Sequence, residues 1–215
     1  MIGVLAFGSL IADPGPELEK IIVQRLPCTT PFNIEYARRS RSRGNAPTLV
    51  SVPKGNGSPV DGVILILKPY TRKKNAKNLL YRRELHEDAN SNQVYDDAAQ
   101  RVKKDALVIE TLPRLQGLSL VYYTSLKANF TEILDVNRTE EQKAQLLAQA
   151  AIDSLTRETF NARKDGIQYL HDNIESGILT PLTEPYRQVL LQWAANAPDL
   201  PTALLHFARQ KGIIS

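Results

Sequence analysis

The segment Val4–Ile11, VLAFGSLI, determines how the fold begins. It belongs to an almost continuous apolar run, residues 2–7, which predicts a strand covered on both faces of a sheet. The run ends at Gly8-Ser9, and the turn-forming residues Asp13–Pro16, DPGP, follow shortly afterwards. Two interpretations of Gly8-Ser9 are open. The glycine supplies the dihedral angles of a tight turn, or it leaves backbone N–H groups uncovered for an anionic ligand.

The rest of the first half of the chain combines short strands with helices. Apolar and alternating patterns predict strands at residues 32–37, 48–52, 60–67, 106–112 and 118–123. The turn cluster PKGNGSP, at 53–59, predicts a hairpin between the strands on either side, and Pro113–Gly117 predicts another. A short helix is expected at 17–24 and a longer one at 75–87. These elements predict an α+β fold with a small mixed β-barrel or sheet and flanking helices.

From Thr139 onward the sequence pattern is helical. Thr139 and Gln142 predict an N-terminal capping box, and Leu147, Ala151 and Leu155 form an apolar stripe along the same helix. Further helices are predicted at residues 166–175, 184–196 and 202–211. We therefore expect two domains, a barrel domain at residues 1–137 and an all-helical C-terminal extension at residues 138–215.

Composition limits the class of protein. The chain has 215 residues, a net charge of +4 and one cysteine, Cys28. That charge is too low to indicate nucleic-acid binding by itself, and none is expected. A single cysteine excludes an intramolecular disulfide and is typical of a reducing compartment, so we expect a cytoplasmic protein. No run approaches the ~20 apolar residues of a membrane span. Cysteine and histidine do not occur at metal-ligand spacing, so we expect no metal or other cofactor.

Three further features could carry chemistry, and each has a purely structural alternative. Glu84, within LLYRREL, is either a general acid/base or a surface carboxylate paired with Arg83 or Lys77. The arginine run ARRSRSRG, which contains Arg38, either holds an anion bidentately or forms a solvated strand edge. Tyr123 offers a hydroxyl group to a pocket, although tyrosines also pack in cores with the hydroxyl at the rim.

The order of these motifs resembles the γ-glutamylcyclotransferase-like superfamily over residues 1–125. The matching motifs are AFGSLI after the first strand, an Arg-Ser pair after the next strand, APTLVSV, VDGVILIL and LLYRREL. The resemblance implies a small β-barrel with the substrate cavity at its mouth. It also implies that Gly8, Ser9 and Leu10 hold a γ-glutamyl group through backbone N–H groups and that Glu84 is the general acid/base. The expected substrate-binding set further includes Phe7, where many members carry tyrosine, Arg38 and Tyr123.

The resemblance implies an enzyme that cleaves a small γ-glutamyl amide by intramolecular cyclisation to 5-oxoproline, without a metal or other cofactor. The alternative is a non-catalytic module on the same fold. Such a module would bind a small anion through Gly8–Leu10 and an arginine of the run, and its helical extension would contact a protein partner.

Overall fold

The computed structural model describes residues 1–85, 91, 93–103 and 106–215. They form two compact units that interleave along the sequence. Unit 1 comprises Met1–Pro31 and Asp61–Lys127, and unit 2 comprises Phe32–Val60 and Ala128–Ser215. The expected division after residue 137 followed the order of the chain. In the structure, residues 32–60 instead group with the C-terminal helices, because their strands pack against those helices.

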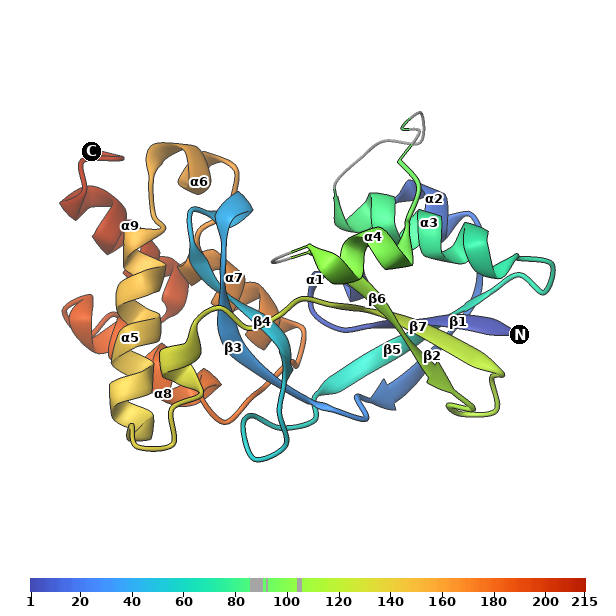
Figure 1. Ribbon diagram of the computed structural model, residues 1–215. Coiled ribbons are helices and arrows are strands. Elements are labelled where there is room, and N and C mark those ends of the chain that lie inside the picture. The colour runs from blue at the N-terminus through green and yellow to red at the C-terminus, as the bar shows by residue number, and fades with distance from the viewer. Residues whose placement is uncertain (86–90, 92, 104–105) are drawn as a thin grey trace. The chain divides into compact units, whose positions relative to one another are not determined.

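Unit 1 contains a five-stranded sheet with β1 at its centre (Figure 1). The strand β1 runs antiparallel to β5 and parallel to β7. Val4, Leu5 and Ala6 are fully buried, which confirms the prediction of a strand covered on both faces. In the order β2-β5-β1-β7-β6, the strands are Ile22–Thr29, Asp61–Leu67, Ile2–Ala6, Leu120–Ser125 and Val108–Pro113. The predicted hairpin around residues 113–117 is confirmed, since β6 and β7 pair antiparallel.

This sheet is open, so the prediction of a β-barrel is wrong. A barrel closes only when its two edge strands pair with each other. Within the part of the chain that the structure describes, β2 and β6 are edge strands and do not pair. Two of the strands that the barrel would have needed form a separate sheet in unit 2. The fold is therefore mixed α and β with an open five-stranded sheet.

Helices cover one face of the sheet (Figure 1). Leu79 and Leu80 of α3 share a buried apolar cluster with Val4 of β1 and Leu65 of β5. The helix predicted at residues 17–24 is wrong in its second half, because the chain turns into β2 after a single helical turn. The end of the predicted helix at 86–87 lies outside the described residues. The helices of unit 1 are α1 (Ser9–Ala12), α2 (Pro16–Glu19), α3 (Lys73–Glu84) and α4 (Asp97–Val102).

Unit 2 begins with a hairpin of β3 (Asn33–Ser40) and β4 (Ala46–Val52), joined through η1 (Arg41–Arg43). The hairpin predicted across residues 53–59 is wrong. The strand before that turn pairs with β3, and the strand after it pairs with β1 and β2. Gly44 at the tip has a φ of 64°, and a Cβ there would lie 2.8 Å from the carbonyl oxygen of Ser154. The hairpin tip therefore packs closely against the helical part of its own unit.

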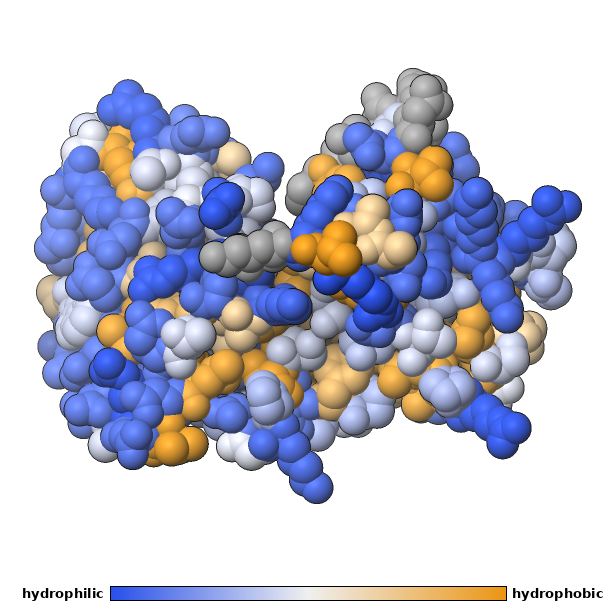
Figure 2. Space-filling model, in the orientation of Figure 1, coloured by the Kyte–Doolittle hydropathy of each residue, from blue (hydrophilic) through white to orange (hydrophobic). Residues whose placement is uncertain are grey.

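Most helices of unit 2 lie where the sequence predicts them, but the helix that follows Thr139 ends at Asp153, so Leu155 of the predicted stripe lies beyond it. The capping box is confirmed, because Thr139 Oγ1 accepts from the Gln142 N–H and the Gln142 side chain accepts from the Thr139 N–H. Tyr36 of β3 packs edge-on against Tyr186, with ring centroids 5.5 Å apart. Hydrophilic side chains cover most of the visible face around α5 (Figure 2). The elements are η2 (Thr131–Ile133), α5 (Glu140–Asp153), α6 (Arg157–Asn161), α7 (Gly166–Glu175), α8 (Thr183–Trp193) and α9 (Leu200–Gln210).

Candidate functional site

The turn after β1 has the conformation that the glycine predicts. Gly8 is buried and has a φ of 65°, a conformation that glycine adopts without steric cost. Its carbonyl oxygen accepts a hydrogen bond from the Ile11 N–H at 3.1 Å. The N–H groups of Ser9 and Leu10 have no acceptor among the described residues. Glycine therefore makes the turn, and the two N–H groups that follow it are not used within the described residues.

Arg83 connects this turn to the end of α3. Its Nη1 donates to Glu84 Oε1 at 2.7 Å, and its Nη2 lies 3.4 Å from Ser9 Oγ. Nε and Nη2 also donate to the carbonyl oxygen of Asp13, at 2.8 and 2.6 Å. Because one small planar guanidinium touches both side chains, the Glu84 carboxylate lies within about 10 Å of Ser9. The two motifs that the sequence singled out are therefore brought together.

Glu84 is the last residue of α3, and its side chain is mostly enclosed. The side chain is 18% exposed, and that of its partner Arg83 is 9% exposed. The expected alternative, a surface carboxylate paired with Arg83 or Lys77, is therefore correct about the Arg83 partner and wrong about the surface. Oε1 accepts the bond from Arg83, and no group among the described residues bonds to Oε2. The hydrogen bond from Arg83 thus orients the carboxylate through Oε1.

The neighbours of Arg83 fix the rotation of α3. Arg82 makes a bidentate pair with Glu17 of α2, at 2.8 and 2.7 Å. The hydrogen bond to Glu17 raises the pKa of Arg82 above its ordinary value, so the guanidinium stays charged. Tyr81 is buried and its hydroxyl accepts from Gln100 Nε2 at 2.8 Å. Three successive side chains of α3 are therefore anchored on different sides of the helix.

Tyr123 is not brought together with Glu84. Its neighbour Tyr122 belongs to the buried cluster between the sheet and α3. Successive residues of a strand point to opposite faces, so Tyr123 projects from the face of the sheet away from α3. There it lies opposite Glu110 of β6, and burial together with the charge of Glu110 raises the pKa of Tyr123. Phe7, in contrast, directly precedes the Gly-Ser turn and is half-buried.

Arg38 belongs to unit 2, on β3, where its carbonyl oxygen accepts from Thr48 Oγ1. Two other members of the arginine run engage different aromatic partners. Arg39 stacks on the Phe130 ring at 3.8 Å and Arg43 on the Tyr169 ring at 4.6 Å. The guanidinium groups of Arg39 and Arg43 therefore lie on two different aromatic rings.

Cys28, the single cysteine of the chain, lacks the environment of a reactive thiolate. Burial and the nearby charge of Asp61 raise the pKa of Cys28, which keeps it a thiol. No group of three or more His, Cys, Asp or Glu side chains in the described ranges could hold a metal ion. Among those same residues, no helix has the length and apolar character needed to cross a membrane.

Two residues that shape the site were missed by sequence reasoning. Asp13 holds Arg83 through its carbonyl oxygen, and its carboxylate accepts a hydrogen bond from the Gly15 N–H at 3.1 Å. Gly15, with a φ of 78°, passes over Arg83, and a Cβ there would lie 3.0 Å from Arg83 Cγ. The DPGP breaker was the one available indication that the chain turns sharply enough here to enclose an arginine.

A scan against protein-family models, a search of curated proteins and a search of solved structures each found no match to this chain. The interpretation of the site therefore rests on its geometry and on the sequence motifs.

Proposed function

We propose that this protein is a γ-glutamylcyclotransferase-like enzyme that converts a γ-glutamyl amide to 5-oxoproline, with Glu84 as general acid/base. One observation carries the proposal. A single guanidinium, that of Arg83, bonds to the Glu84 carboxylate and contacts Ser9 in the Gly-Ser turn. We also propose that unit 1 belongs to the γ-glutamylcyclotransferase-like superfamily, although its sheet is open and not closed into a barrel.

The proposed reaction begins with proton transfer to Glu84. The α-ammonium of the substrate gives a proton to Oε2, the oxygen that Arg83 does not occupy. The neutral amine nitrogen then attacks the γ-carbonyl carbon and forms the C–N bond of a five-membered ring. When the tetrahedral intermediate collapses, the original amide C–N bond breaks. Glu84 returns its proton to the leaving nitrogen, the ring nitrogen gives up its second proton to the released amine, and the products are 5-oxoproline and a protonated amine.

The Gly-Ser turn supplies the binding groups in this scheme. The uncovered N–H groups of Ser9 and Leu10 donate to the substrate and stabilise negative charge on the attacked carbonyl oxygen. The nucleophile and the carbonyl belong to one molecule, so holding the substrate in a reactive geometry can contribute ~7 kcal/mol or more to the rate. The reaction as proposed uses no metal or other cofactor.

The test is 5-oxoproline release from a panel of γ-glutamyl amides, comprising a γ-glutamyl dipeptide, glutathione and a γ-glutamyl-ε-lysine. We expect the wild-type protein to turn over at least one of them. Glu84→Gln keeps the size and the hydrogen bond from Arg83 but cannot carry the proton, so turnover should fall by several orders of magnitude while binding persists.

Glu110→Gln is the matched control. Glu110 pairs with Arg101 on an exposed edge of the same unit, and its loss should leave turnover unchanged. Full activity of Glu84→Gln contradicts the assignment of Glu84. Binding of γ-glutamyl amides without turnover by the wild type contradicts the enzyme and favours the non-catalytic binding module.

A further inference from the structure

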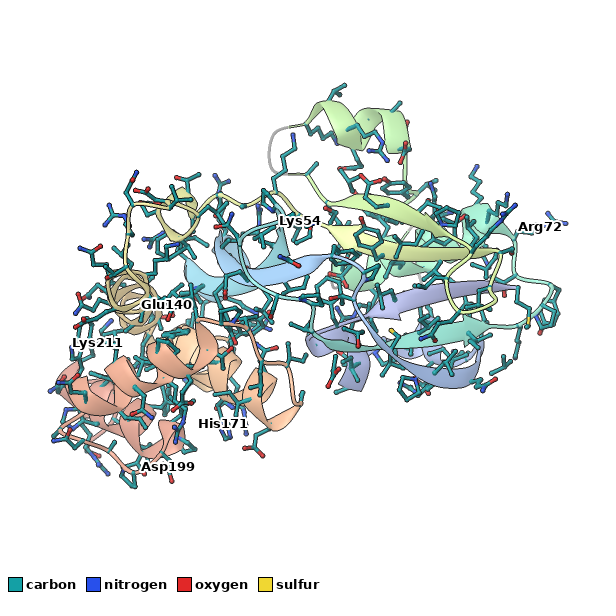
Figure 3. All side chains as sticks on the ribbon, turned by 90° about the horizontal axis from the view of Figure 1, so that it is seen from below. Lys54, Arg72, Glu140, His171, Asp199 and Lys211 are labelled. Atoms are coloured by element: carbon teal, nitrogen blue, oxygen red, sulfur yellow. The ribbon has the colours of Figure 1, made fainter. Side chains whose placement is uncertain are left out.

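Unit 2 contains a polar cavity of about 260 Å³ that none of the groups above explains. Its walls come from the turn after β4, the first turn of α5 and the segment before α8. Figure 3 shows Glu140 at the α5 side. The charged and apolar side chains that line it are Glu35, Glu140, Lys143, Ile133, Pro181 and Leu182. The volume suits a ligand of a few heavy atoms.

Glu35 is the buried charge of this cavity, with 2% exposure. Its Oε1 accepts from the Tyr36 N–H at 2.9 Å and from Thr180 Oγ1 at 2.6 Å, and its Oε2 accepts from the Leu182 N–H at 3.4 Å. A carboxylate has about four lone-pair positions, so Oε2 can accept one more donor. Burial raises the pKa of Glu35, while these hydrogen bonds and the charge of Lys143 oppose that rise.

Lys143 is the cation of the same cavity, and it is half-buried on α5. Its charge acts on Glu35, yet no carboxylate of the described residues lies within salt-bridge distance of its ammonium group. Glu140, one helical turn earlier, likewise forms no ion pair within the described residues. The cavity therefore holds a buried acceptor and a half-buried donor of opposite charge that do not meet.

A ligand that satisfies both groups carries a cationic hydrogen-bond donor for Glu35 and an anionic group for Lys143. We propose that this cavity binds a small α-amino acid with a neutral aliphatic side chain, whose ammonium group bonds to Glu35 and whose carboxylate bonds to Lys143. The side chain contacts Ile133, Pro181 and Leu182. Glu140 at the rim repels an acidic side chain. This site does not depend on the proposed function of unit 1.

The test is titration of the full chain with L-valine at about pH 8. This pH is chosen because a carboxyl group such as that of Glu35 is ionised there unless its pKa is strongly raised. Calorimetry measures affinity, and amide chemical shifts of Gly57 and Leu182 locate the ligand. We expect a Kd below ~1 mM, which is within reach of a ligand of this size. Isobutylamine lacks the carboxylate and isovalerate lacks the ammonium group, and each should bind at least 10-fold more weakly.

Lys143→Met should weaken valine binding at least 10-fold while the unfolding transition stays in place. Lys164→Met, which removes an exposed lysine of the same unit, is the matched control and should bind like the wild type. L-glutamate should bind more weakly than valine, and Glu140→Gln should reduce that difference. The proposal is wrong if valine causes no saturable shift at these amides, if either half-molecule binds as tightly as valine, or if Lys143→Met binds unchanged.

Discussion

The two units stabilise charges near their cores in different ways. In unit 1, carboxylates pair with arginines, as in Glu17 with Arg82 and Glu84 with Arg83, and all four side chains keep some exposure. In unit 2, Glu35 and Asp165 are almost completely buried and bond mainly to backbone N–H groups and hydroxyls. A paired carboxylate near the surface can still meet a substrate. A carboxylate enclosed by donors of its own unit holds segments together, and Glu35 can also meet a ligand because it lines a cavity.

The largest effect is expected from Glu35→Ala. The change leaves the Thr180 hydroxyl and the N–H groups of Tyr36 and Leu182 without their acceptor. Unsatisfied buried donors cost ~1–3 kcal/mol each, and water entering from the adjacent cavity offsets part of the loss. We expect unit 2 to lose about 2–4 kcal/mol of unfolding free energy. Trp193, the single tryptophan, lies in α8, so its fluorescence in urea follows unit 2.

Two variants bracket this prediction. Glu35→Gln keeps an acceptor oxygen and should lose less than Glu35→Ala. Glu141→Ala removes an exposed glutamate from the first turn of α5 and should change the Trp193 transition by only a few tenths of a kcal/mol. Equal losses for Glu35→Ala and Glu141→Ala would show that Glu35 does not hold the segment at residues 180–182.

A smaller effect is expected from Arg82→Met in unit 1. It removes the bidentate pair with Glu17, but that carboxylate can turn toward water. We expect a loss of about 1–2 kcal/mol, seen as faster hydrogen exchange of the α3 amides. The Trp193 transition should stay where it is. Arg101→Met is the control, because the exposed pairs of Arg101 should contribute nothing measurable.

The smallest effect is a pH dependence confined to unit 2. Because burial raises the pKa of Glu35 above its ordinary 4.5, the folded state binds more protons than the unfolded state just above that pH. The unfolding free energy therefore falls as pH rises through this interval, by at most about 1.4 kcal/mol per pH unit. Glu35→Gln carries no such proton, so its stability should fall less steeply.

Urea titrations followed by Trp193 at a series of pH values above 4.5 measure this difference between wild type and Glu35→Gln. Asp165 adds a slope of the same sign to both proteins, since burial also raises its pKa. Parallel curves for the two proteins would mean that Glu35 has the same pKa folded and unfolded.

Predictions from local sequence succeeded where short-range interactions decide the structure. The helix α7 has the predicted bounds, Gly166–Glu175, because Asp165 caps its first turn and Gly177 follows its end. The predictions of pairing between distant segments failed. The turn at residues 53–59 looks like a hairpin, yet the strand after it pairs with β1 and β2. Side chains also alternate between the two faces of β7. Because Tyr122 faces α3, Tyr123 points to the other face of the sheet, away from Glu84.

The sequence by itself determined most strands and helices, the capping box at Thr139 and the two motifs Gly8-Ser9 and Glu84, because apolar periodicity and capping act over a few residues. The tertiary structure alone decided that the sheet of unit 1 stays open and that residues 32–60 join the C-terminal helices. It also decided that Arg83 connects Ser9 to Glu84. Such contacts join residues far apart in the chain, and their choice depends on which arrangement buries the apolar faces and satisfies the polar groups.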